Sequence, residues 1–208
     1  MGPDTTVGSV STGSAPEGFF RFLRYGHILS AVLREILEEK FLRQLSTHSL
    51  TRAQFCFLKL IALNADLQVG EAARCIGVSA AACSKNIDKL ERLGLVVRGS
   101  SPDDRRATLL TASEEGLALV HEYEGLKASW VAPVIGGLGD ERATQLCELL
   151  EEVCIGLLKH EKSGRTGPCL RCAGYYHADC SVGRVEGGCA LQLGRNERST
   201  ELLGDGST

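Results

Sequence analysis

Residues 76–112 read IGVSAAACSKNIDKLERLGLVVRGSSPDDRRATLLTA, and this stretch decides the fold. Gly77 and Ser79 separate two short helical patterns, because glycine ends a helix readily and serine caps the start of the next. Gly94 stops the second pattern before two short apolar runs that flank a polar turn. Two helices joined by a tight turn and followed by a hairpin predict a helix-turn-helix with a wing.

Helical patterns precede this stretch. Apolar residues recur every three or four positions from Phe19 to about Leu45, which predicts one long helix. Thr51 and Gln54 form a capping-box pattern, so a second helix is expected to begin there. A short helix over Val69 to Ile76 then leads to Gly77.

Two further helices are expected after the wing. Ser113 is a candidate N-cap for the first, which should run to about Trp130 and end before Pro133. The second should run from Asp140 to about His160 with a strongly apolar face. The order of elements predicts a mainly α fold, a winged helix-turn-helix with a small β-hairpin.

The composition is that of a globular protein, with 43% hydrophobic residues, 24% charged residues and a net charge of −3. We find no apolar run long enough to cross a bilayer and no signal-peptide pattern, so a cytoplasmic location without membrane contact is expected. Residues 1–18 and 194–208 are predicted to be disordered tails. The sequence holds no phosphate loop, nucleotide fingerprint or nucleophile elbow, and we do not expect an enzyme.

Residues 50–116 resemble the DNA-binding core of the MarR family. The resemblance rests on LTRAQ (50–54), EAA (71–73), IGVS (76–79), CSKNIDKLERLGLV (83–96) and PDDRR (102–106), in that order and at the family's separations. Ala112-Ser113 replaces the family's Leu-Thr pair, and Cys83 stands where an aliphatic residue is usual. The flanking helices extend the resemblance to residues 19–160.

The resemblance implies a homodimer that reads a pseudo-palindromic DNA site, with half-sites about one helical turn apart. Residues 49–112 would form the DNA-binding part, and residues 19–48 and 113–160 the dimerisation helices. Repression of transcription is the family's usual mode. A small, aromatic effector bound between the dimerisation helices and the winged part is one mechanism of control that the resemblance implies.

The residues of the second helix in the helix-turn-helix are candidates for DNA contact. Small and polar side chains near its N-terminus suit the major groove. Lys85 would meet a phosphate or a guanine edge, and the serines either bases or phosphates. The alternative is that they are ordinary exposed helix residues. The candidates are Ser79, Ala80, Ala81, Ser84 and Lys85.

The wing supplies a second set of candidates. An arginine at a hairpin tip can enter a narrow minor groove, and the family resemblance favours Arg106 over Arg105 for this role. Asp104 is expected to pair with Arg98 or a neighbouring arginine and hold the hairpin. A solvated loop of ion pairs is the alternative.

The nine cysteines fall into two groups. Five lie singly on helical patterns, where burial in a core is the simplest explanation. These are Cys56, Cys75, Cys83, Cys147 and Cys154.

The other four, Cys169, Cys172, Cys180 and Cys189, follow a C-x2-C-x7-C-x8-C pattern within residues 161–193. Four thiolates can bind an iron–sulfur cluster or zinc. Metal-free redox thiols or an unstructured tail are the alternatives, and His177 could replace one ligand. We expect the site to modulate DNA binding. A thiol oxidoreductase is disfavoured because no βαβ unit precedes the CxxC.

Overall fold

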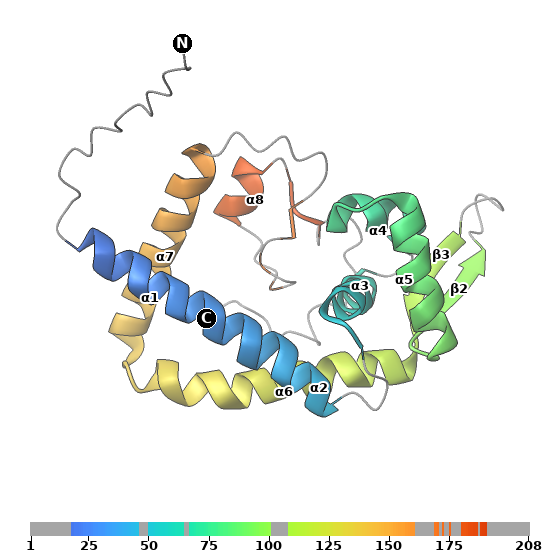
Figure 1. The fold of residues 1–208 in the computed structure, drawn as a ribbon, viewed down its shortest axis with the longest axis horizontal. Coiled ribbons are helices and arrows are strands. Elements are labelled where there is room, and N and C mark those ends of the chain that lie inside the picture. The colour runs from blue at the N-terminus through green and yellow to red at the C-terminus, as the bar shows by residue number, and fades with distance from the viewer. Residues whose placement is uncertain are drawn as a thin grey trace, which may run out of the picture.

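The computed structural model describes residues 18–45, 50–64, 67–100, 108–160, 169–170, 172, 175, 180–186 and 188–190 (Figure 1). The two predicted tails lie outside these ranges, apart from Gly18. The elements form a winged helix-turn-helix with long flanking helices, which confirms the predicted fold class. Within the described ranges, no helix combines the length and the apolar character that a membrane span needs.

The N-terminal helical segment is not one regular helix. α1 (Phe19–Val32) continues into a π-helical segment, η1 (Leu33–Lys40), and then into α2 (Phe41–Leu45). The hydroxyl of Tyr123 donates a hydrogen bond of 2.7 Å to the carbonyl of Leu37 in η1. This contact ties the segment to the later helix α6 (Glu114–Gly136).

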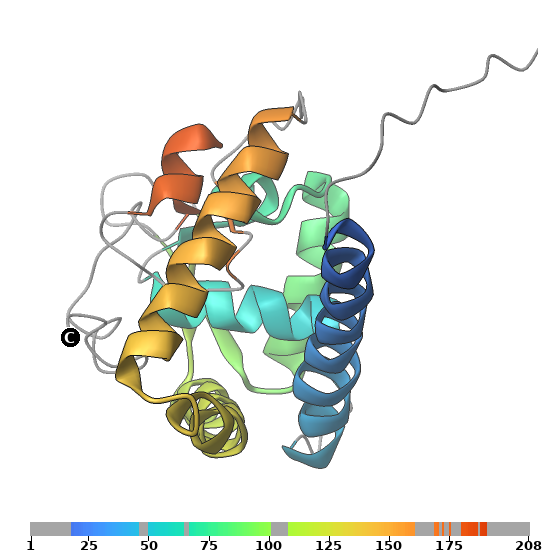
Figure 2. The same ribbon diagram turned by 90° about the vertical axis from the view of Figure 1, so that its left-hand side faces the viewer.

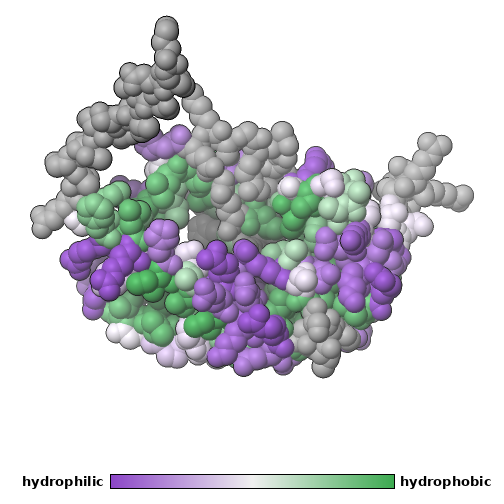
Figure 3. Space-filling model, viewed as in Figure 1, coloured by the Kyte–Doolittle hydropathy of each residue, from purple (hydrophilic) through white to green (hydrophobic). Residues whose placement is uncertain are grey.

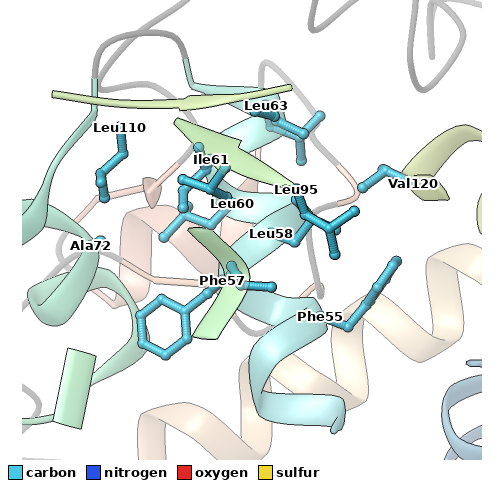
Figure 4. Packing of buried hydrophobic residues seen from close by; sticks show 14 of the residues in the cluster. Phe55, Phe57, Leu58, Leu60, Ile61, Leu63, Ala72, Leu95, Leu110 and Val120 are labelled. Carbon is cyan, nitrogen blue, oxygen red and sulfur yellow. The ribbon is translucent and has the colours of Figure 1, made fainter. Parts of the chain in front are cut away.

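Helix α3 (Arg52–Leu63) is the centre of the hydrophobic core (Figure 4). It begins at the predicted capping box, in which Thr51 and Gln54 each accept a hydrogen bond from the other's backbone N–H. Phe57, Leu58 and neighbouring side chains of α3 are at most a few per cent exposed. Burying this apolar surface supplies the main driving force that fixes the surrounding helices.

The helix-turn-helix consists of α4 (Val69–Ile76) and α5 (Ala80–Arg92), as predicted. Gly77 adopts a left-handed conformation with φ 76°, which a side-chain-bearing residue rarely takes. The N–H of Val78 donates to the carbonyl of Ala73, which closes the end of α4.

Three short strands form the sheet, in the order β1-β3-β2. β2 (Val96–Ser100) and β3 (Thr108–Ala112) are the antiparallel wing, close to the predicted runs. β1 (Leu67–Gln68) pairs with β3 and was not predicted. A strand of two residues is too short to show an alternating hydrophobic pattern in the sequence. Its strand conformation depends on pairing with the distant strand β3.

The prediction that the helix after the wing ends before Pro133 was wrong, since α6 runs to Gly136. Proline removes one backbone donor but leaves the rest of the helix bonded, and the N–H of Gly137 reaches the carbonyl of Pro133. α7 (Asp140–His160) has the predicted bounds and no buried residue. Cys147 and Cys154 are therefore exposed in the single chain, contrary to the expectation of burial.

The described part of the C-terminal extension lies between α7 and the winged part (Figure 1), and its short helix runs beside α7 (Figure 2). The backbones of Cys169 and Cys189 pair in an isolated parallel β-bridge, which is a pairing of main chains and not a disulfide. A short helix, α8 (Ser181–Val185), packs against α7. Cys189 and Ala190 join the hydrophobic core, so the extension is anchored to the folded domain.

Candidate nucleic-acid interface

Helix α5 has one buried face and one exposed face. Cys83, Ile87 and Leu90 are 0% exposed and pack into the core. Four of the predicted DNA-contacting residues lie exposed at or near its N-terminus, and Ser84 is half-buried there. The four are Ser79, Ala80, Ala81 and Lys85. The helix thus presents small side chains and one cation to solvent, an arrangement that suits close approach to base edges.

Ser79 has a structural role at this end of the helix. Its hydroxyl oxygen accepts a hydrogen bond of 3.2 Å from the N–H of Ala82, as expected of an N-cap. The Sγ of Cys83 donates to the carbonyl of Val69 at 3.4 Å. Burial raises the pKa of the Cys83 thiol to about 11, so the thiol stays protonated and serves packing. These contacts hold the exposed end of α5 against α4.

Arg98 links the wing to helix α5. Its guanidinium lies 2.5 Å from Oδ1 of Asp88 and 3.5 Å from Oε2 of Glu91, both on α5. The sequence prediction paired Asp104 with Arg98 or a neighbouring arginine, and Asp104 lies outside the described residues. The two α5 partners of Arg98 were not predicted. Their spacing of three residues, which puts them on one helix face, was the available signal.

A close contact joins the end of α5 to the start of α6. The hydroxyl of Ser113 donates to the carbonyl of Gly94 at 2.6 Å. The backbone N–H of Ser113 donates to the carbonyl of Leu95 at 3.1 Å. The same hydroxyl oxygen accepts from the N–H of Gly116. A Cβ on Gly116 would lie 2.2 Å from the carbonyl oxygen of Leu95. Only glycine allows α6 to pass this close to the wing.

The tip of the wing lies outside the described residues. Asp104, Arg105 and Arg106 fall in residues 101–107, so their predicted roles stay predictions. Strands β2 and β3, which carry the tip, are described on both sides and pair over five positions.

The structure brings the four clustered cysteines together only in part. The N–H of Cys169 donates to the carbonyl of Gly188, and the N–H of Ala190 donates to the carbonyl of Cys169. Cys180 and Cys189 both border Gly183. Among the described side chains, no group of three or more His, Cys, Asp or Glu is arranged to hold a metal ion. His177 lies outside the described residues.

The sequence profile of the MarR family matches residues 48–107. This stretch of the chain is therefore similar to a MarR-family domain. The match covers α3, the helix-turn-helix and the first part of the wing, which are the elements that shape the exposed face of α5. The chain is also similar to the HTH-type transcriptional regulator MhqR of Bacillus subtilis (strain 168), with 26% identity over 126 residues. That alignment covers 61% of this chain and 86% of the relative.

Solved structures share the fold of this chain. A mutant of S. aureus MepR superposes with a TM-score of 0.57 at 18% identity and covers 65% of this chain and 98% of its own. Streptococcus pneumoniae FabT, in complex with DNA, gives a TM-score of 0.57 at 16% identity and covers 67% of this chain and 99% of its own. These alignments span about two thirds of the chain, which leaves roughly the length of the tails and the cysteine-rich extension outside the shared fold.

Proposed function

We propose that this protein is a transcriptional regulator that binds double-stranded DNA as a homodimer, with α5 in the major groove. The observation that carries the proposal is the exposed N-terminal end of α5 beside a wing that Arg98 fastens to it. Similarity to MhqR, a transcriptional regulator, and to FabT, solved with DNA, supports it. Repression is the mode we favour, and Arg106 is the residue we propose for the minor groove.

The long helices support the dimer. α1 and α7 contain no buried residue, yet both carry large apolar side chains. Figure 3 shows apolar patches among polar ones over the half of the molecule that holds these helices. Contiguous exposed apolar side chains along a helix favour burial against a partner. The stripe on α7 consists of Leu146, Leu150, Val153 and Leu157.

The test is a selection of bound duplexes from a random-sequence pool. We expect enrichment of a pseudo-palindrome whose half-sites lie about one helical turn apart. Arg106→Ala should reduce binding to the selected site, while Arg142→Ala, an exposed arginine on α7, should not. Recovery of no sequence preference by the wild-type protein would contradict the proposal.

We also propose that Cys169, Cys172, Cys180 and Cys189 bind an iron–sulfur cluster or zinc that modulates DNA binding. The backbone pairing of Cys169 with Cys189, and the closeness of Cys180 and Cys189 to Gly183, favour one metal or cluster site shared by these cysteines. The four thiols would supply the ligands, and loss or oxidation of the bound group would change how the extension sits against α7.

Anaerobic purification followed by a visible spectrum and assays of iron, sulfide and zinc tests this proposal. Absorption near 400 nm with iron and sulfide identifies a cluster, whereas a colourless protein with about one zinc per chain identifies a zinc site. Cys169→Ser with Cys172→Ser should abolish the bound group. A wild-type protein without metal would contradict the proposal.

A further inference from the structure

A cluster of buried charges lies between α3 and α6, away from the DNA-binding face. Lys59 on α3 and Lys127 on α6 are 4% and 8% exposed. Nζ of Lys59 lies 2.7 Å from Oε1 of Glu124, and Nζ of Lys127 lies 2.9 Å from Oε2 of the same carboxylate. One carboxylate thus bridges two ammonium groups from two helices.

The charges of these three residues do not balance. Within this trio two buried cations face one anion. Glu38, which pairs with Arg52, adds a negative charge that also acts on Lys127. A buried charge is costly unless further polar groups compensate it. Burial lowers the pKa of Lys127, and the nearby Lys59 lowers it further against the opposing effect of Glu124. Burial opposes ionisation of Glu124, but the two lysines outweigh it and lower the pKa of that carboxyl. The site therefore needs another polar partner.

Tyr175 of the cysteine-rich extension is that partner. Its hydroxyl donates a hydrogen bond of 2.9 Å to Oε2 of Glu124 and accepts one from Nζ of Lys127. Nζ of Lys59 lies 4.2 Å from the centre of the ring, and Nζ of Lys127 lies 4.6 Å from it. Electron-rich aromatic rings stabilise cations at this range. Tyr175, itself 51% exposed, thus adds a hydrogen bond for Lys127 and a cation–π contact for both lysines.

The position of Tyr175 connects this cluster to the cysteines. Its N–H donates a hydrogen bond of 3.1 Å to the carbonyl of Cys172, in a turn that directly follows the CxxC. Further along, Cys189 and Ala190 enter the core, and α8 packs on α7. The extension therefore contacts α3, α6 and α7, and it spans the winged part and the long helices.

We propose that Tyr175 is a latch that docks the cysteine-rich extension onto the Lys59–Glu124–Lys127 cluster and so couples the state of the cysteines to the geometry of the DNA-binding part. The coupling rests on the proposed function, whereas the docking does not. A change at Cys169 or Cys172 moves the turn that carries Tyr175. When the phenol leaves, the buried ammonium groups of Lys59 and Lys127 lose its hydrogen bond and its ring contacts. Helices α3 and α6 then move apart, or water enters between them.

Hydrogen–deuterium exchange of the full chain tests the docking. We compare wild type with Tyr175→Ala and Tyr175→Phe, which keeps the ring but removes the hydroxyl. Backbone exchange across residues 169–190 should be at least about tenfold faster in Tyr175→Ala, because a charge-assisted hydrogen bond and a cation–π contact are both lost. Tyr175→Phe should give an intermediate rate, since the ring still faces Lys59.

Glu124→Gln should also speed exchange in the extension, and Glu122→Gln is its matched control on an exposed position of the same helix. In a second measurement, Tyr175→Ala should weaken binding to the selected DNA by at least about threefold. A less preorganised protein loses more conformational entropy when it binds. Wild-type exchange in both Tyr175 variants, or wild-type DNA affinity of Tyr175→Ala, would overturn the latch. A wild-type protein without sequence-specific binding would contradict the proposed function instead.

Discussion

Arg98 on strand β2 lies 2.5 Å from the carboxylate of Asp88 on helix α5. The pair joins strand β2 of the wing to helix α5 of the helix-turn-helix. Glu91, also on α5, adds a second contact to Arg98 at 3.5 Å. An ion pair at this junction fixes the angle between the wing and α5. Both side chains are partly exposed, so the pair serves orientation more than stability.

Asp88→Asn therefore tests the pair as an orienting contact. We expect the free energy of unfolding to change by at most about 1 kcal/mol, as for exposed ion pairs. Affinity for the selected DNA site should nevertheless fall several-fold, as measured by fluorescence anisotropy. A rise in affinity would show that the carboxylate merely repels phosphates, and would contradict the orienting role.

Gly116→Ala should be strongly destabilising. The added Cβ would lie 2.2 Å from the carbonyl oxygen of Leu95 and 3.1 Å from a methyl of Leu58. We expect a loss of at least about 3 kcal/mol in urea unfolding, because backbone must shift. Gly125→Ala is the matched control on the same helix. Its Cβ would meet nothing within 4 Å, so the alanine should stabilise α6 by up to about 1 kcal/mol.

The Cys83 thiol makes stability depend on pH in the alkaline range. Burial raises its pKa from 9.0 to about 11 in the folded chain. Below about pH 9 both states keep the proton, and the contribution is fully present. As the pH rises toward about 11, the thiol of the unfolded chain ionises first. The free energy of unfolding therefore falls by roughly 2 kcal/mol.

Urea unfolding of wild type and Cys83→Ala at about pH 8 and about pH 10.5 measures this contribution. The wild type should lose more stability between the two values than the variant does. Other alkaline groups, including the buried Tyr123 whose pKa burial also raises, affect both proteins alike. Equal losses in the two proteins would contradict the assignment to Cys83.

Much of the fold could be predicted because the elements begin and end at residues with local signals. The Thr51 cap, the left-handed Gly77 and the Ser113 cap each act within one turn of helix, so sequence alone reveals them. The strand Leu67–Gln68 and the helix beyond Pro133 depend on neighbours distant in the chain or on the rest of a long helix, which no local pattern records.

The candidate site was predictable to a similar extent. The exposed face of α5 follows from helical spacing, whereas the partners of Arg98 follow from how the wing packs. Tyr175 stands between Cys172 and Cys180, and its sequence neighbours give no sign of a buried partner. Its role emerges only because the extension meets Glu124, 51 positions earlier, in space.

Leu150→Glu should convert the proposed dimer to a monomer. Leu150 lies 41% exposed on a helix without buried residues, so a charge there should leave the single chain folded and disrupt only a partner's contact. Val97→Glu, at a 55% exposed position on the wing, is the control and should stay dimeric. Light scattering after size-exclusion chromatography measures both masses, and a Leu150→Glu dimer would exclude this face from the interface.

The most direct test of the central claim, that α5 reads DNA, is the salt dependence of affinity for the selected site. Lys85→Ala is compared with wild type and with Lys159→Ala, an exposed lysine on α7. If Lys85 meets a phosphate, its loss should weaken binding and reduce the slope of log affinity against log salt by about one per chain. Lys159→Ala should match wild type. Wild-type affinity and slope in Lys85→Ala would contradict the placement of α5 in the groove.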